Sequence, residues 1–209
     1  MSVRICPIVE GDGEQYAIRD LITRIGFQFW NENEYIEVLT PIKRPRGKLM
    51  HTDDLERAVE TASIKLGAKG GAILVLIDSD KECPAQHGPA LLERANLRCG
   101  HLNMPISVVL AHCEYEAWFL AAASSLAGVG TVRADLQNHP TPENKRDAKG
   151  WLSEQMTDRY SPTQHQTAFT TKFDLQMARD NAPSFDKLCR DLKRMFTELQ
   201  SQATPSTTP

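Results

Sequence analysis

The sequence predicts an α/β fold in which a Rossmann-type parallel sheet is flanked by helices and followed by a mainly helical C-terminal extension. In the first half of the chain, short apolar runs typical of strands alternate with segments that have helical apolar spacing. Residues 72–77 are apolar at every position, which indicates a strand buried on both faces. After Gly130 no further strand pattern follows, and the remaining periodic segments are helical.

The individual elements follow from this spacing and from the glycines and prolines between them. The expected strands are residues 3–9, 35–39, 72–77 and 106–110. The expected helices are residues 15–25, which Gly26 is expected to end, and residues 54–66, 89–98 and 114–124. Residues 41–48 contain two prolines and four basic side chains, so we expect a loop there.

Length and composition favour one core with an elaboration. The 209 residues, 41% of them hydrophobic, are enough to bury one sizeable core. We expect a core over residues 1–127, a helical extension packed on it over residues 128–199, and a disordered tail rich in Ser, Thr and Pro over residues 200–209.

The same properties narrow the class of protein. No apolar run approaches the roughly 20 residues that cross a bilayer, and the N-terminus lacks the pattern of a signal peptide. We therefore expect a cytoplasmic protein without a membrane partner. The five cysteines are odd in number and scattered, which favours reduced thiols. A net charge of −3 gives no global basic signature for nucleic acid.

Acidic side chains follow three of the expected strands. The sets are Glu10 with Glu14, Asp78 with Asp80, and Glu114 with Glu116. In open parallel sheets, ligands bind beyond the carboxyl ends of the strands, so these sets are expected to share one crevice. Carboxylates that close repel one another by about 1 kcal/mol per pair at 4 Å even in water. A divalent cation relieves this repulsion, and carboxylates are ligands that Mg²⁺ favours.

Two local patterns fit such a site. Residues two apart in an extended segment face the same side, so Asp78 and Asp80 are expected to address the same ion or two neighbouring ions. Gly11 and Gly13 allow a phosphate to approach the backbone at the start of a helix, and Glu10 beside them suits a metal ligand or a general base. The alternatives are a turn with a helix cap after each strand and, for the acids at 114 and 116, first-turn residues of a helix.

The segments 9–14 and 76–80 resemble the Toprim domain of topoisomerases, DnaG-type primases and OLD-family nucleases. The chain is still more similar to small, stand-alone Toprim-like bacterial proteins of largely unassigned function. The further segments that carry this similarity are residues 110–119, 144–146, 172–175 and 184–188, together with Tyr160. The similarity covers roughly residues 3–195, nearly the whole chain.

The resemblance implies a compact sheet that binds Mg²⁺ or Mn²⁺ and acts on phosphodiester bonds, as a nuclease of DNA or RNA with a possible place in bacterial defence. It implies that Glu10 is the catalytic acid or base and that Asp78 and Asp80 hold the metal, to which we add Glu14 and Glu114 as further ligands. Catalytic or phosphate-facing cations are expected at Lys145, Arg146 and Lys172.

The basic loop and one lysine remain open to two interpretations. Arg44, Arg46 and Lys48 suit a loop that grips phosphates, and a solvated loop explains them as well. Lys81 directly follows the aspartates, departs from the pattern of the stand-alone proteins, and is expected to compete with a metal for their carboxylates.

Two other functions compete with a nuclease. A non-catalytic Toprim-like module that binds nucleic acid or a partner ATPase would keep the same acids. An apolar strand followed by Asp-x-Asp, as at residues 73–80, also resembles nucleotide-sugar glycosyltransferases, but the turn at residues 10–14 is unexplained there.

Overall fold

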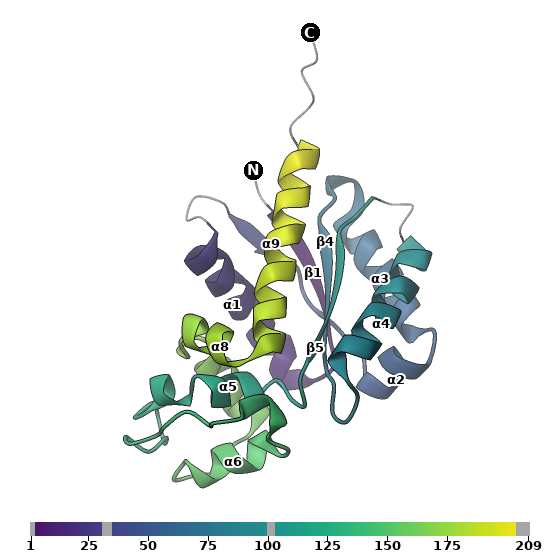
Figure 1. The fold of residues 1–209 in the computed structure, drawn as a ribbon. Coiled ribbons are helices and arrows are strands. Elements are labelled where there is room, and N and C mark those ends of the chain that lie inside the picture. Colours follow the sequence, from purple (N-terminus) through teal and green to yellow (C-terminus); the bar gives the residue numbers. More distant parts are fainter. Residues whose placement is uncertain (1–2, 31–34, 100–102, 204–209) are drawn as a thin grey trace.

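The computed structural model of the chain describes residues 3–30, 35–99 and 103–203 and has the predicted α/β fold (Figure 1). The sheet has the strand order β2-β1-β4-β5, β3 also pairs with β1, and every pairing is parallel. The strands are β1 (Val3–Val9), β2 (Ile36–Val38), β3 (Ile42–Lys43), β4 (Ala72–Asp78) and β5 (Ile106–Ala111). Because β1 and β4 are neighbours, the predicted acids at their carboxyl ends lie side by side.

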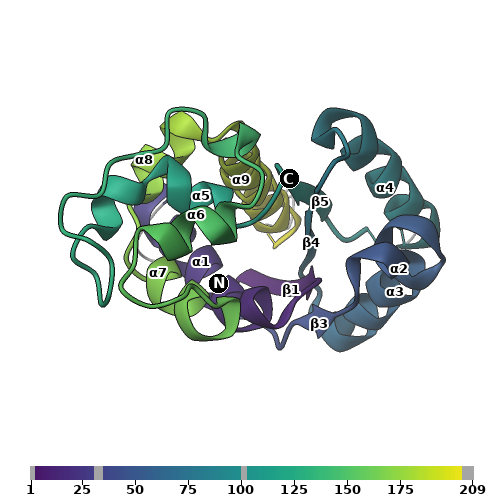
Figure 2. The same ribbon diagram turned by 90° about the horizontal axis from the view of Figure 1, so that it is seen from below.

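Helices cover both faces of the sheet (Figures 1 and 2). One face is covered by α1 (Asp12–Phe29) and α9 (Pro183–Ala203). The other is covered by α2 (Arg46–His51), α3 (Asp54–Leu66) and α4 (Pro84–Cys99). Within the described residues, no helix has both the length and the apolar character that crossing a bilayer requires.

The central strand β4 divides its side chains between two cores. Leu74 and Leu76 pack with α1 and α9, whereas Ile73, Val75 and Ile77 pack with α3 and α4. Successive side chains of a strand point to opposite faces, and both faces are covered here. The uninterrupted apolar run is therefore explained by burial on both sides, as the sequence predicts.

The C-terminal part is mainly helical, as predicted, and packs on the core. Its apolar side chains join those of α1 and the sheet in one continuous cluster. Figure 2 shows these helices grouped on the side of the sheet that α1 occupies. They are α6 (Ala148–Glu154), α7 (Thr167–Thr170) and α8 (Leu175–Asn181), with the 3₁₀ turn η4 (Pro142–Asn144) and the π turn η5 (Pro162–Gln166). From the expected core, α5 (Ala117–Ala121) packs against them and is followed by the 3₁₀ turn η3 (Ala123–Leu126).

Gly26 does not end the first helix, contrary to the sequence prediction. The helix α1 continues to Phe29, and Gly26 is buried within it. A Cβ atom at position 26 would lie 2.2 Å from Cδ1 of Ile36. The glycine therefore serves a close approach between α1 and the edge strand β2 rather than a helix end.

Three further local predictions were wrong. The expected basic loop contains β3 and α2, because Leu49 and Met50 are buried and turn the segment into a packed helix. The expected helix over residues 114–124 is shorter, with α5 followed by a 3₁₀ turn. The last helix continues to Ala203, beyond the expected start of the tail, and residues 204–209 lie outside the described part of the chain.

We predict that the turn into β4 tolerates substitution very unequally at its two glycines. Gly70 and Gly71 both have positive φ, at 68° and 142°, but a Cβ at Gly71 would lie 2.6 Å from the carbonyl oxygen of Arg4, whereas one at Gly70 meets open space. Gly71→Ala is expected to lower the free energy of unfolding by about 3 kcal/mol, and Gly70→Ala by about 1 kcal/mol. Urea unfolding of both variants checks this, and equal losses would contradict it.

Candidate functional site

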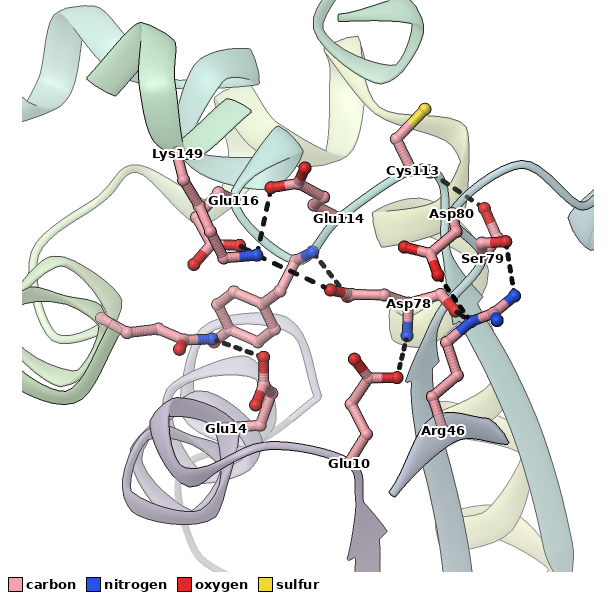
Figure 3. Close-up of polar contacts among 12 residues, drawn as sticks. Glu10, Glu14, Arg46, Asp78, Ser79, Asp80, Cys113, Glu114, Glu116 and Lys149 are labelled. Carbon is pink, nitrogen blue, oxygen red and sulfur yellow. Dashed lines mark hydrogen bonds and ion pairs between the residues drawn. The ribbon is translucent and has the colours of Figure 1, made fainter. Parts of the chain in front are cut away.

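The ends of β1 and β4 are joined by a side chain (Figure 3). Glu10 directly follows β1, and its Oε2 accepts a hydrogen bond of 3.1 Å from the backbone N–H of Asp78, the last residue of β4. The strands pair in parallel register up to Val9 and Leu76. The first two acids that the sequence predicts to converge are therefore neighbours.

Asp78 ties β4 to the segment that follows β5. Its side chain is buried, and Oδ1 accepts a hydrogen bond of 2.7 Å from the backbone N–H of Tyr115. Ser79 reinforces the link, because its hydroxyl accepts a hydrogen bond of 2.9 Å from the N–H of Cys113. Cys113 has the positive φ of 61° that this sharp turn requires. Three strand ends thus meet around one carboxylate.

Lys149 lies among the acids and was not predicted from the sequence. Its ammonium nitrogen is 3.0 Å from Oε2 of Glu116, 3.1 Å from Oε2 of Glu114 and 3.9 Å from Oδ2 of Asp78 (Figure 3). The lysine belongs to the first turn of α6, more than thirty residues after Glu116 in the sequence. No motif surrounds it that would distinguish it from a solvated helical lysine.

Glu116, which the sequence places in the third acidic set, is an interior residue of the site. It is completely buried and precedes α5 instead of lying within its first turn. Its Oε1 accepts a hydrogen bond of 3.0 Å from the hydroxyl of Tyr160, and Lys149 faces its other oxygen. Buried carboxylates require such partners, because an unpaired charge in the interior is strongly unfavourable.

Burial and mutual repulsion perturb the protonation of these groups. Burial, helped by the charges of Glu14 and Asp80, raises the pKa of Glu10 from its ordinary value of 4.5 to about 7, although the Asp78 N–H opposes the shift. Burial raises the pKa of Asp78 well above its ordinary value, and the charges of Glu10 and Glu116 add to this shift.

The lysine and its buried partner are perturbed as well. Burial raises the pKa of Glu116, against the influence of Lys149. Burial favours the neutral form of Lys149, but the three carboxylates around it outweigh burial and raise its pKa. The site thus combines one firmly held ammonium with more carboxylates than that ammonium can neutralise.

Asp80 lies outside the strand, so strand alternation does not set its direction as predicted. Its φ of 52° is left-handed, and its side chain is about half exposed. The guanidinium of Arg46 fixes this turn by donating to the carbonyl oxygens of Asp78 and Ser79 at 2.8 and 2.9 Å. It also lies 3.2 Å from Oδ2 of Asp80 and forms an ion pair with Glu82. Its donors are therefore directed at the protein itself, which leaves little of the predicted role in phosphate binding.

Gly11 and Gly13 make room for side chains of the same chain. A Cβ at Gly13 would lie 1.7 Å from Oε1 of Gln166, and one at Gly11 would lie 2.3 Å from Oε2 of Glu14. Glu14 is buried, and its Oε1 accepts a hydrogen bond of 3.3 Å from the Gln166 amide. The turn is thus filled by Glu14 and Gln166 where the sequence predicts an open phosphate cradle.

A cavity of about 310 Å³ opens beside the acids. Arg146 and Lys81 line it together with Asp80 and Glu114, so it brings positive charge next to the acidic cluster. Lys81 makes no ion pair within the described residues, and Arg46 takes the place beside Asp80 where we expected Lys81 to compete.

The other predicted cations contribute no contact to the acidic cluster in the part of the chain that the structure describes. Arg44 donates to the carbonyl oxygen of Lys43, and Lys48 is exposed. Lys145 is half-buried, and Lys172 is exposed after α7.

The donor set suits a hard divalent cation, although it is not gathered into a finished site. Across residues 3–30, 35–99 and 103–203, no group of three or more His, Cys, Asp or Glu side chains is arranged to hold a metal ion. Glu10 and Asp78 nevertheless supply carboxylate oxygens at adjacent strand ends, where burial raises both pKa values and neighbouring carboxylates add to the shift. Carboxylate oxygens are donors that Mg²⁺ and Mn²⁺ accept.

Fold and site together define an α/β protein whose parallel sheet carries buried carboxylates and one lysine beyond its strand ends. The model of a protein family described as Domain of unknown function (DUF4276) matches residues 9–193, which includes every residue of this cluster. The chain therefore belongs to the DUF4276 family. No curated protein and no solved structure matches it.

We predict that Glu10 makes the folded protein less stable as the pH rises. Its folded pKa of about 7 lies above the ordinary value of 4.5, so its stabilising contribution is complete below pH 4.5 and is lost as the pH rises to 7. Relative to Glu10→Gln, the wild type is expected to lose on the order of 2–3 kcal/mol of unfolding free energy across this window.

Urea unfolding at a series of pH values, with a chelator present, measures this difference. Glu93→Gln is the matched control, because Glu93 is exposed on α4 away from the cluster. A wild type and Glu10→Gln protein with parallel pH profiles would contradict the assignment of a buried, repelled carboxyl at position 10.

Proposed function

We propose that this protein is a Toprim-like, Mg²⁺- or Mn²⁺-dependent nuclease that hydrolyses phosphodiester bonds of DNA or RNA. The observation that carries the proposal is the contact between Glu10 and the backbone of Asp78 at the ends of adjacent strands. It brings together two of the three acids that carry the Toprim resemblance, at one edge of the sheet.

The residues that would hold the metal are Glu10 and Asp78, with Asp80 and Glu14 nearby. A bound divalent ion would supply positive charge against the phosphate oxygens and would acidify a bound water. It would also offset the negative charges of Glu10 and Glu116, which add to the effect of burial in raising the pKa of Asp78.

Glu10 is the proposed proton acceptor for the attacking water. A general base works best when its pKa lies near the operating pH, and burial brings the pKa of Glu10 to about 7. The hydrogen bond from Asp78 fixes Oε2, which leaves Oε1 for the proton. Glu10 lies just before α1, in a turn whose space at Gly11 and Gly13 is filled by the side chains of Glu14 and Gln166. This packing fixes its position.

The substrate would approach through the cavity beside the acids. Arg146 and Lys81 line this cavity and supply the cations that the phosphate backbone requires. Lys145 precedes Arg146 on the same loop, and Arg44 and Lys48 belong to the segment around α2 that also carries Arg46. A partner ATPase, as the resemblance implies, would act through these surfaces.

We predict metal-dependent cleavage that is lost on substitution of the central acids. With Mn²⁺ or Mg²⁺, the wild type is expected to cleave single- or double-stranded DNA or RNA, and Glu10→Gln is expected to lower the rate by about 10²- to 10⁴-fold. Asp78→Asn should abolish cleavage, because it removes a charged ligand. Fluorescent oligonucleotides, separated by electrophoresis, give the rates.

The control is Asp53→Asn, an exposed carboxylate that pairs only with Arg57 in the described structure. It should cleave as the wild type does. Cleavage that persists in a chelator, or full activity in Asp78→Asn, would contradict the proposal. If only an added ATPase restores activity, the nuclease acts as part of a complex.

Arg146 is predicted to contribute one phosphate contact. Measured by fluorescence anisotropy in a chelator, Arg146→Ala should weaken nucleic-acid binding and reduce the slope of log K against log salt by about 1. Arg133→Ala is the control, because Arg133 is exposed in the same helical part and pairs with Asp135. An unchanged slope in Arg146→Ala would remove this residue from the substrate path.

A further inference from the structure

The arrangement around Lys149 points to the number of metal ions that the site accepts. We propose that the ammonium of Lys149 occupies the position of a second cation, so that the protein binds one divalent ion per chain and not two. This inference rests on the proposed function, because it concerns the same carboxylates. It assigns Lys149 a positioning role as the permanent counter-ion of Glu114 and Glu116.

The carboxylates divide into two groups on either side of Asp78 (Figure 3). On one side Oδ2 of Asp78 faces Lys149, which also contacts Glu114 and Glu116 at 3.1 and 3.0 Å. On the other side Glu10 is joined to the backbone of Asp78. One internal cation thus serves the first group, and in the described residues none contacts the carboxylate of Glu10.

The chemistry of an ammonium suits this position. It has three N–H donors and no acceptor, so it can donate to Glu114 and Glu116 at 3.1 and 3.0 Å while its charge also faces Asp78 at 3.9 Å. Glu116 has no access to solvent, and among the described residues its carboxylate has only Lys149 and the Tyr160 hydroxyl as polar partners. Removal of Lys149 would therefore leave a buried charge uncompensated, and another cation is the natural replacement.

The backbone around Lys149 is built to keep the lysine in place. Asp147, at the N-cap of α6, has a left-handed φ of 59°, and its side chain accepts a hydrogen bond of 2.9 Å from the N–H of Gly150. A Cβ at Gly150 would lie 2.2 Å from the Asp147 carboxylate, so glycine is needed for this cap. Ser153 donates to the Lys149 carbonyl and accepts from the N–H of Tyr160, which couples the lysine to the other partner of Glu116.

The test counts bound Mn²⁺ in the full chain. Equilibrium dialysis followed by electron paramagnetic resonance of free Mn²⁺ gives the number of ions per chain for the wild type, Lys149→Gln and Lys149→Arg. The wild type should bind one ion. Lys149→Gln should bind two, because the amide can still donate to Glu116 but brings no charge. Lys149→Arg, which keeps the charge, should bind one.

Each outcome decides the question. Two ions in the wild type, or one in a folded Lys149→Gln protein at saturation, would overturn the inference and leave the metal-dependent function standing. No ion in the wild type would overturn both. Thermal unfolding followed by circular dichroism establishes that each variant is folded, and if Lys149→Gln is not, the count in the wild type alone decides between one ion and two.

Discussion

The hydrogen bond from the Asp78 backbone to Glu10 depends on one constraint, the parallel pairing of β1 with β4. Parallel strands bring their carboxyl ends to the same edge of a sheet. From that edge, the chain after β1 continues toward one face of the sheet and the chain after β4 continues toward the other. The first continues through α1 and the second through the turn held by Arg46. The acids are close to each other because the strands are, and the site is a consequence of the sheet.

Much of this could be predicted from the sequence because the signals are local. The run at residues 72–77 identifies the central strand, and helical spacing identifies α3 with its bounds and the middle of α1. Once Glu10 and Asp78 follow parallel strands, their meeting is a matter of topology. Predictions failed where a tertiary contact overrides a local signal. The sequence predicts a helix end at Gly26, but the glycine lies inside α1, where the side chain of Ile36 packs closely against it. The sequence predicts a loop at α2, but burial of Leu49 stabilises a helix there.

The rest of the site could not be predicted, because it comes from residues that have no local signature. Lys149 is one lysine in a short helix, and Gln166 lies in an irregular turn, 152 residues from the Glu14 that it contacts. Their roles arise only when the helical part folds back over the strand ends. The cations that were predicted there, Lys145 and Lys172, belong to the same part of the chain. The same segment supplies a cation to the acids, but that cation is Lys149 and not one of the predicted lysines.

The charge balance of the cluster argues that it exists for function and not for stability. Replacing a buried ion pair by apolar residues is often neutral or stabilising, so a fold does not need such a cluster. Here burial raises the pKa values of the carboxyls of Glu10, Asp78 and Glu116. The folded protein therefore disfavours the charged form of each of them. Lys149 compensates one side only. A divalent cation bound beside Glu10, as we propose, would compensate the other side at the point where the two central strands end.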